Sequence, residues 1–282
     1  MPPMSGLLKG KSPFYPAQPV PTELFVGRGA QIARIMERGA AQVQVGKPIT
    51  MFVEGDYGIG KSSIAAFAQW AAEAKYGLHP IYALLGGSED LNDVAAAVMQ
   101  ATLRSGAYTP KRAEKIKNWM AKYIGKQSLG GLTVNMEALK ADAPAVATPH
   151  GLLEFLTTTL QRIEDKGVSG IFLVLDEVNG ITKNPAFAHF LKALVDTNAM
   201  LPTPLPLLLM MCGVEERRRE LIRAHQAIDR VFDVVQIDSL SEGEMKEFFR
   251  SAFESVNMKV NDVALASLAF YSAGLPKMMH IV

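Results

Sequence analysis

The feature that most constrains the fold lies between residues 49 and 77, where an apolar run, a cluster of glycines and an alanine-rich segment follow one another. The run ITMFVEG predicts a buried strand, and the segment SSIAAFAQWAAEAKYG predicts a helix that ends at Gly77. Their junction matches the pattern G-x-x-x-x-G-K-S/T in full, with Gly55, Asp56, Tyr57, Gly58, Ile59, Gly60, Lys61 and Ser62. This pattern between a strand and a helix predicts an α/β protein with a phosphate-binding loop.

The chemistry of this loop follows from its residue types. Glycines let the backbone curl so that successive N–H groups point inward, and the helix adds the positive end of its dipole. Lys61 is expected to contact the β- and γ-phosphates of a nucleotide, the Ser62 hydroxyl to coordinate Mg²⁺, and Ser63 to join the nucleotide-binding residues. The alternative is a chance glycine-rich turn, which the strand, the helix and the lysine together disfavour.

A pair of carboxylates ends a second apolar run, in the segment IFLVLDEVN. Ligands of open α/β sheets bind at the carboxyl ends of the strands, where Asp176 and Glu177 would lie. We expect Asp176 to hold Mg²⁺ through water, and Glu177 to orient and deprotonate an attacking water molecule. Taken alone, the pair could be an exposed acidic loop. A kinase would not require Glu177, so the pair favours hydrolysis.

The order of elements predicts the fold class. Between residues 24 and 238, apolar strands alternate with helices, which predicts a doubly wound, mostly parallel sheet covered on both faces. Residues 239–282 carry only helical patterns and are expected to form a small helical lid, cut short at its end. Residues 1–23 hold six prolines and predict an extended arm. Residues 107–148 exceed what the βαβ units need and are interpreted as an insertion with a basic helix and a hairpin.

The composition excludes several classes of protein. With 282 residues, 49% of them apolar, the chain can bury a sizeable core and is not a disordered protein. A net charge of +1 provides no global attraction to nucleic acid or anionic lipid. The single cysteine, Cys212, cannot form an intrachain disulfide. The N-terminus lacks the continuous apolar region of a secretory signal, and no apolar run is long enough for a membrane helix. These features favour a cytoplasmic protein.

Four motifs together resemble the AAA+ ATPases, and within them the branch of replication initiators and STAND signalling ATPases. They are the loop above, the segment LVLDE, the segment ELFVGRGAQIARI and the segment SAGLPK. The resemblance implies that Phe25, Val26, Gly27 and Arg28 line the pocket of the adenine base, although Gly29 stands where an acid is usual. It also implies that Pro276 and Lys277 reach over the nucleotide from the lid, with Lys277 near the γ-phosphate. A lysine at the exposed start of a helix is the alternative for Lys277.

Two further family positions depart from the usual pattern or have competitors. The position of the sensor-1 polar residue falls at Cys212 and Gly213, which implies slow hydrolysis. Arg230, in the segment AIDRVFDVV, resembles the arginine finger that completes a neighbouring subunit's site. A local pairing of Arg230 with Asp229 or Asp233 is the alternative. The other candidates, Arg217, Arg218, Arg219 and Arg223, stand among glutamates, and a salt-bridged solvated helix is the favoured interpretation for them.

A basic segment in the insertion allows two interpretations. Residues 111–126 hold six cations and one acid, with Trp119 and Tyr123 four residues apart. They could form a patch that follows phosphates and stacks on bases. The favoured interpretation is an amphipathic helix whose lysines face water and whose apolar residues face the core, namely Ile116, Trp119, Met120 and Tyr123.

Together these observations predict a protein that binds ATP with Mg²⁺ and hydrolyses ATP slowly to drive a conformational or assembly switch. We expect a homo-oligomer or an ATP-dependent protein partner. Two alternatives remain open: a STAND-type signalling scaffold with incidental turnover, and a DNA-associated ATPase of the initiator or transposition-regulator kind. A small-molecule kinase is disfavoured.

Overall fold

The structure is a computed structural model that describes residues 12–14, 24–105, 114–116, 119–120, 143–163 and 167–281. The proline-rich arm (except 12–14) and most of the insertion lie outside the described residues, and so does most of the expected hairpin. Of the residues that this hairpin would include, 143–146 are helical. None of the described helices is long and apolar enough to cross a membrane.

Five strands form one parallel sheet, as the sequence predicts, and their order in the sheet is β2-β3-β4-β1-β5. The strands are β1 (Ile49–Glu54), β2 (Leu78–Leu84), β3 (Gly170–Asp176), β4 (Leu207–Gly213) and β5 (Asp233–Gln236). Strands β3 and β4 are buried along their whole length, which explains their uninterrupted apolar sequence. The glycine-rich loop follows the fourth strand in this order, and the acidic pair follows the second.

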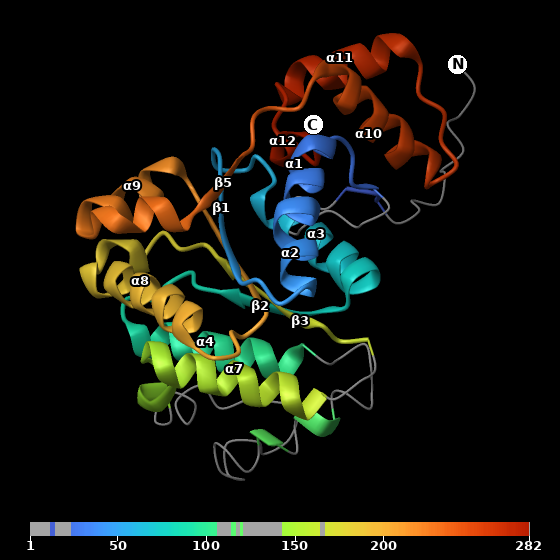
Figure 1. Cartoon of the computed structure of the whole chain (residues 1–282). Helices are drawn as coiled ribbons and strands as arrows, with labels where there is room; N and C mark the ends of the chain where they lie inside the picture. Colours follow the sequence, from blue (N-terminus) through green and yellow to red (C-terminus); the bar gives the residue numbers. More distant parts are fainter. Residues whose placement is uncertain are drawn as a thin grey trace, which may run out of the picture.

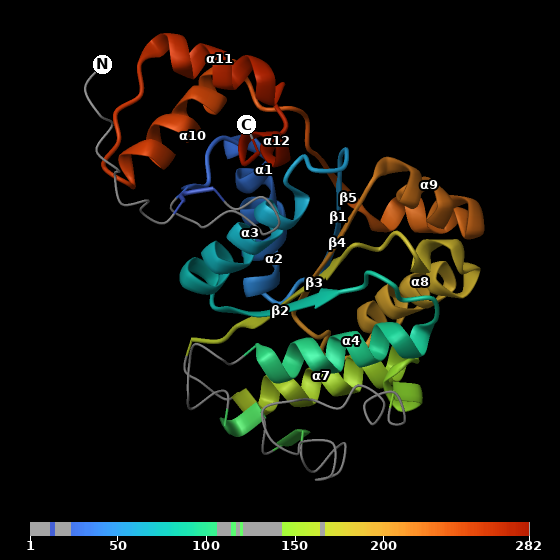
Figure 2. The same ribbon diagram turned by 180° about the vertical axis from the view of Figure 1, so that it is seen from behind.

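Helices cover both faces of the sheet (Figures 1 and 2). One face carries α1 (Gly29–Arg34), the π-helical η2 (Ile35–Ala40), α2 (Ala41–Gln44) and α3 (Lys61–Tyr76). The other carries α4 (Leu91–Arg104), α7 (Pro149–Ile163), α8 (Pro185–Met200) and α9 (Glu215–Ala224). The sequence predicts a charged helix near residues 214–228, but α9 ends at Ala224, and the 3₁₀ helix η5 (Gln226–Val231) follows it. Helix α3 ends where predicted, because Gly77 adopts φ 66°, the left-handed conformation of a C-cap.

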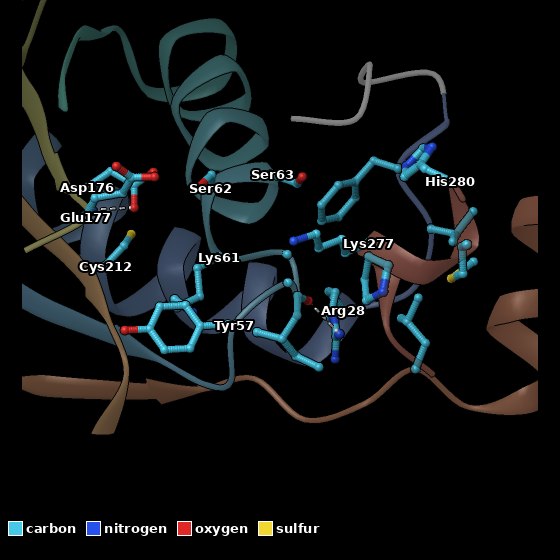
Figure 3. Close-up of a pocket in the computed structure, with 18 of the residues that line it drawn as sticks. Arg28, Tyr57, Lys61, Ser62, Ser63, Asp176, Glu177, Cys212, Lys277 and His280 are labelled. Carbon is cyan, nitrogen blue, oxygen red and sulfur yellow. Dashed lines mark hydrogen bonds between the residues drawn. The ribbon is translucent and has the colours of Figure 1, made fainter. Parts of the chain in front are cut away.

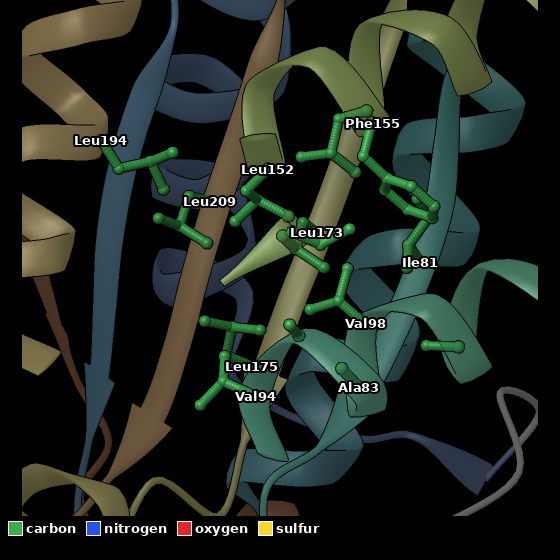
Figure 4. Close-up of a cluster of buried hydrophobic side chains, with 14 of the residues drawn as sticks. Ile81, Ala83, Val94, Val98, Leu152, Phe155, Leu173, Leu175, Leu194 and Leu209 are labelled. Atoms are coloured by element: carbon green, nitrogen blue, oxygen red, sulfur yellow. The ribbon is translucent and has the colours of Figure 1, made fainter. Parts of the chain in front are cut away.

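Two apolar cores result, one on each face of the sheet. The larger lies under α4, α7 and α8, where Ile81, Leu173 and Phe155 pack together (Figure 4). The smaller lies under α3 and includes Phe172, Ile64 and Cys212. The two cores hold the carboxyl ends of the strands in a rigid frame, and this frame positions the site.

A third apolar cluster joins the C-terminal helices α10 (Glu242–Glu254), α11 (Asp262–Ser272) and α12 (Pro276–Met279), as predicted for a helical lid. Helix α10 begins with a capping box, in which Ser241 and Glu244 satisfy each other's backbone N–H groups. Leu24 and Phe14 pack into this cluster, and the Phe14 ring lies 5.8 Å from that of Phe253. The segment before α1 is therefore attached to the lid.

The described part of the basic segment packs as an amphipathic helix would. Ile116 and Met120 are fully buried, and Trp119 is 9% exposed. The ring centroid of Trp119 lies 5.1 Å from that of Phe155 in α7. Trp119 is thus a core residue and cannot stack on a base, which favours the structural interpretation of this segment.

Candidate nucleotide-binding site

The glycine-rich loop connects β1 to α3 and needs its glycines for two different reasons. Gly58 and Gly60 have φ of 78° and 100°, a region that side chains disfavour. A Cβ on Gly58 would also lie 2.9 Å from the Cβ of Lys277. The loop thus combines a left-handed backbone with close contact to the lid.

Lys61 is the first residue of α3, and its side chain folds back over the loop. Its Nζ donates hydrogen bonds to the carbonyl oxygens of Gly55, at 2.9 Å, and Asp56, at 2.8 Å. Burial lowers the pKa of Lys61, and the nearby Cys212, Asp176 and Asp56 oppose this shift. The loop therefore surrounds the Lys61 ammonium group at the N-terminus of α3. Both the ammonium group and the helix N-terminus favour a bound anion.

The acidic pair lies at the same edge of the sheet as the loop. The strand register places Leu175 beside Met211 and Val53 beside Cys212, so β3, β4 and β1 end at one level. Figure 3 shows Asp176, Glu177 and Cys212 on one side of the start of α3.

Asp176 and Glu177 differ in exposure. Asp176 is 2% exposed, and its Oδ1 accepts a hydrogen bond from the Glu177 N–H at 2.8 Å. Its other oxygen, Oδ2, accepts one from the Tyr82 hydroxyl at 2.6 Å. Glu177 is exposed and has φ 58°, an uncommon conformation that turns the chain at the end of β3. A buried, fixed carboxylate thus stands beside an accessible one.

The Glu177 side chain lies against Gly86, in the turn after β2. A Cβ on Gly86 would be 2.4 Å from the Glu177 Oε2. The absence of a side chain at residue 86 therefore leaves room for this carboxylate.

The lid and the segment before α1 close the opposite side of the site. The Lys277 N–H donates a hydrogen bond to the Gly58 carbonyl at 3.1 Å, and Pro276 lies 3.5 Å from the Cβ position of Gly60. Arg28 donates to the Ile59 carbonyl at 3.2 Å and to the Asp238 carbonyl. Its pKa is lowered by burial, against the charges of Glu244 and Asp238. Arg28 thus connects the loop to the segment that leads into the lid.

Residues of the glycine-rich loop, the acidic pair, the lid and the segment before α1 line one cavity of about 530 Å³. Of the residues predicted to hold a nucleotide or Mg²⁺, the lining includes Phe25, Val26, Arg28, Tyr57, Gly58, Ile59, Gly60, Lys61, Ser62, Ser63, Asp176, Pro276 and Lys277, together with Glu177. Gly27, Gly55 and Asp56 are predicted nucleotide-binding residues that do not line the cavity. Gly27 contacts the lid, because its Cβ position lies 2.3 Å from the Glu244 Oε1. Its glycine therefore allows the segment to pass close to α10.

The cavity has further lining residues that the sequence did not indicate: Leu24, Tyr82, Asn179, Leu240, Phe248, Met279 and His280. Several of them are apolar or aromatic and lie on the lid side, as suits the flat face of a base. Burial lowers the pKa of His280, whose ring lies 5.1 Å from that of Phe248. Of these residues, Asn179 is the one whose sequence position could have suggested a place in the site, because it follows Asp176 by three residues. Its Oδ1 is buried without a hydrogen-bond partner among the described residues.

Cys212 lies in this cavity at the end of β4, at the position of the expected sensor-1 residue. It is fully buried, and burial raises the pKa of its thiol well above the usual value. A thiol is a weak donor and a weak acceptor, so Cys212 is a poor hydrogen-bond partner for phosphate or water.

Arg230 is not in this cavity. It is exposed and lines a second cavity, of about 920 Å³, near the amino ends of β1, β4 and β5. The two carboxylates that could bind it locally are bound by other arginines: Asp233 by Arg34 at 2.5 Å, and Asp229 by Arg218 at 3.3 Å.

Helix α9 is salt-bridged, as its composition predicts. Arg217 pairs with Glu220 at 2.6 Å, and Arg219 pairs with Glu215 at 2.7 Å. Arg218 reaches back to Glu54, the last residue of β1, at 2.7 Å. This third contact joins α9 to the strand that ends at the glycine-rich loop.

The fold is shared with solved structures of low sequence identity. A Walker-type ATPase of Pyrococcus abyssi matches with a TM-score of 0.59 and 12% identity, over 91% of this chain and 66% of that one. The ORC1 protein of Aeropyrum pernix in complex with DNA matches with 0.56 and 15%, over 90% and 58%. A RuvB mutant of Thermotoga maritima matches with 0.52 and 14%, over 93% and 63%.

These likenesses define the fold class. The five-stranded parallel sheet with its flanking helices is an α/β fold that matches that of AAA+ P-loop ATPases. The chain spans about two thirds or less of the length of these three proteins. No protein-family model matches the sequence, and a search of curated proteins finds no match either.

Proposed function

We propose that this chain binds ATP with Mg²⁺ and hydrolyses it slowly, in an assembly where subunits complete one another's sites. The observation that carries the proposal is the convergence of Lys61, Ser62, Asp176 and Glu177 on one cavity, at the N-terminus of α3. Backbone N–H groups and a lysine at a helix start suit phosphate oxygens, and a hydroxyl beside a buried carboxylate suits Mg²⁺.

Each side chain has a role in this proposal. Lys61 would exchange its bonds to loop carbonyls for bonds to the β- and γ-phosphates. Ser62 and Asp176 would hold Mg²⁺, which neutralises charge on the phosphates. Glu177, exposed at the mouth, would accept the proton of the water that attacks the γ-phosphorus. The apolar lid side, with Phe25, would enclose the base.

The work of the cycle is proposed to be conformational. The lid contacts the loop through backbone, from Lys277 to Gly58, so a change in the loop after γ-phosphate loss would reach the lid directly. The buried thiol of Cys212 at the sensor-1 position supports slow turnover. The alternative is a STAND-type signalling scaffold, in which bound ATP holds one conformational state and turnover is incidental.

Arg230 is proposed to act in trans. It lies near the opposite ends of the strands from the cavity, so it could serve only the site of another subunit. An arginine finger contributes on the order of 10³-fold or more to the rate. We expect ATP turnover per subunit to rise with protein concentration, and we expect Arg230→Ala to abolish that rise while leaving ATP affinity unchanged.

A mixing experiment makes this test sharp. Arg230→Ala keeps an intact site, and Glu177→Gln keeps an intact finger, so a mixture of the two inactive variants should regain activity. Arg223→Ala, an exposed arginine of α9, is the matched control and should behave as the wild type. A flat turnover curve for the wild type, or no recovery on mixing, would remove the role proposed for Arg230.

The DNA-associated alternative is addressed by filter binding to duplex DNA with and without ATP. The segment DRVF and the excess of cations in residues 111–126 support it, whereas Trp119 does not, because Trp119 is buried in the core. ATP-dependent retention of DNA would favour that alternative over a signalling scaffold.

Gly86→Ala is expected to slow hydrolysis about tenfold with little change in ATP affinity or in melting temperature. The new Cβ would displace only the flexible end of the Glu177 side chain, away from its position over the site. The measurement is steady-state kcat and the Kd of ATP, with Gly243→Ala as control, because no atom lies within 4 Å of that Cβ position. An unchanged kcat would show that the contact with Gly86 does not position Glu177.

A further inference from the structure

The middle of β2 brings a tyrosine to the acidic pair. Tyr82 lies in the strand next to β3, paired in register with Val174, two residues before Asp176. Its ring packs against the apolar core under α3. The ring is thereby fixed. Tyr82 lines the cavity, and its hydroxyl lies near the Asp176 carboxylate and the backbone carbonyl of Ser62.

The hydroxyl proton of Tyr82 has two possible acceptors, and the distances distinguish them. The Asp176 Oδ2 lies 2.6 Å away, whereas the Ser62 carbonyl lies 3.5 Å away. A hydroxyl has a single proton, and a short distance to a carboxylate is typical of a charge-assisted bond. Tyr82 therefore donates to Asp176.

This bond completes the fixation of Asp176. Its Oδ1 already accepts from the Glu177 backbone N–H, so each carboxylate oxygen has one donor from the protein. A carboxylate offers about four lone-pair sites, and those left over are available on the cavity side.

We propose that Tyr82 is a positioning residue that orients the Asp176 carboxylate for Mg²⁺ beside Ser62. This proposal rests on the proposed function, because Tyr82 would orient a ligand of the same Mg²⁺ ion. A phenylalanine would fill the same space in the core, so packing alone does not require the hydroxyl.

The test is the Mg²⁺ dependence of nucleotide binding by the Tyr82→Phe variant. A fluorescent ATP analogue is held at fixed concentration while Mg²⁺ is titrated. The Mg²⁺ concentration for half-maximal binding should rise about tenfold, the factor that one hydrogen bond to a charged group supplies. Binding of the analogue in EDTA should stay unchanged, and kcat at saturating Mg²⁺ should stay within about twofold of the wild type.

Tyr271→Phe is the matched control, because Tyr271 is exposed on α11, away from the cavity. If Tyr82→Phe reaches half-maximal binding at the same Mg²⁺ concentration as the wild type, the proposal is overturned and the proposed function remains intact. Equal losses in EDTA and in Mg²⁺ would also overturn it, since they would assign Tyr82 a purely structural role. If the wild type itself shows no Mg²⁺-dependent binding, the proposed function fails first.

Discussion

Replacing Lys61 by alanine is expected to abolish ATP hydrolysis and to weaken binding of MgATP roughly a thousandfold. Lys61 would supply two charge-assisted hydrogen bonds to phosphate oxygens, together worth about 4 kcal/mol. Since 1.4 kcal/mol corresponds to a factor of ten, about three orders of magnitude in Kd follow. Calorimetric titration with ATP in the presence of Mg²⁺ measures the effect.

The fold should survive this change. The Lys61 side chain bonds to two loop carbonyls and does not belong to an apolar core, and alanine is a good helix former. Lys75→Ala is the matched control, because Lys75 lies in the last turn of the same helix and is exposed. Tight MgATP binding by Lys61→Ala would contradict the assignment of this loop to phosphate.

Much of the fold was predictable because it depends on local patterns. The apolar strands and the glycine-rich loop were recognised from periodicity and residue type, and the predicted strands match β1 to β5 to within about three residues. Helix α9 was predicted too long, because the polar sequence around His225 continues without a glycine or proline to mark the end. A helix end that no glycine or proline marks depends on tertiary contacts, and local sequence propensity does not predict these contacts.

The candidate site was predictable where its residues adjoin a strand end. The loop and the Asp176–Glu177 pair follow apolar strands directly, and a parallel sheet brings such ends to one edge. Tyr82 and Gly86 were missed because their role depends on β2 pairing with β3, and that pairing cannot be derived from either segment alone. The lid residues Phe248 and His280 were missed for the same reason, since their approach to the cavity depends on how two separate units pack.

Glu177→Gln separates binding from chemistry and is expected to lower kcat by about 10²–10⁴-fold, the usual contribution of a general base. ATP affinity should remain within a few-fold of the wild type, because Glu177 stands at the mouth of the cavity and Asp176 is the buried carboxylate. Glutamine has the same shape and the same backbone demands at φ 58°, so the turn after β3 should persist. The rate of single-turnover hydrolysis and the Kd of ATP, measured on the same preparation, test these two expectations.

The matched control is Glu89→Gln, an exposed glutamate just after the turn that follows β2, at the same edge of the sheet. It repeats the loss of one negative charge without touching the proposed base. If both variants lose the same factor in kcat, the effect is electrostatic and Glu177 is not the base. If Glu177→Gln alone loses activity and still binds ATP tightly, the result supports Glu177 as the general base. The same variant then serves as the ATP-bound form in which to ask whether the lid and its contact from Lys277 to Gly58 respond to the γ-phosphate.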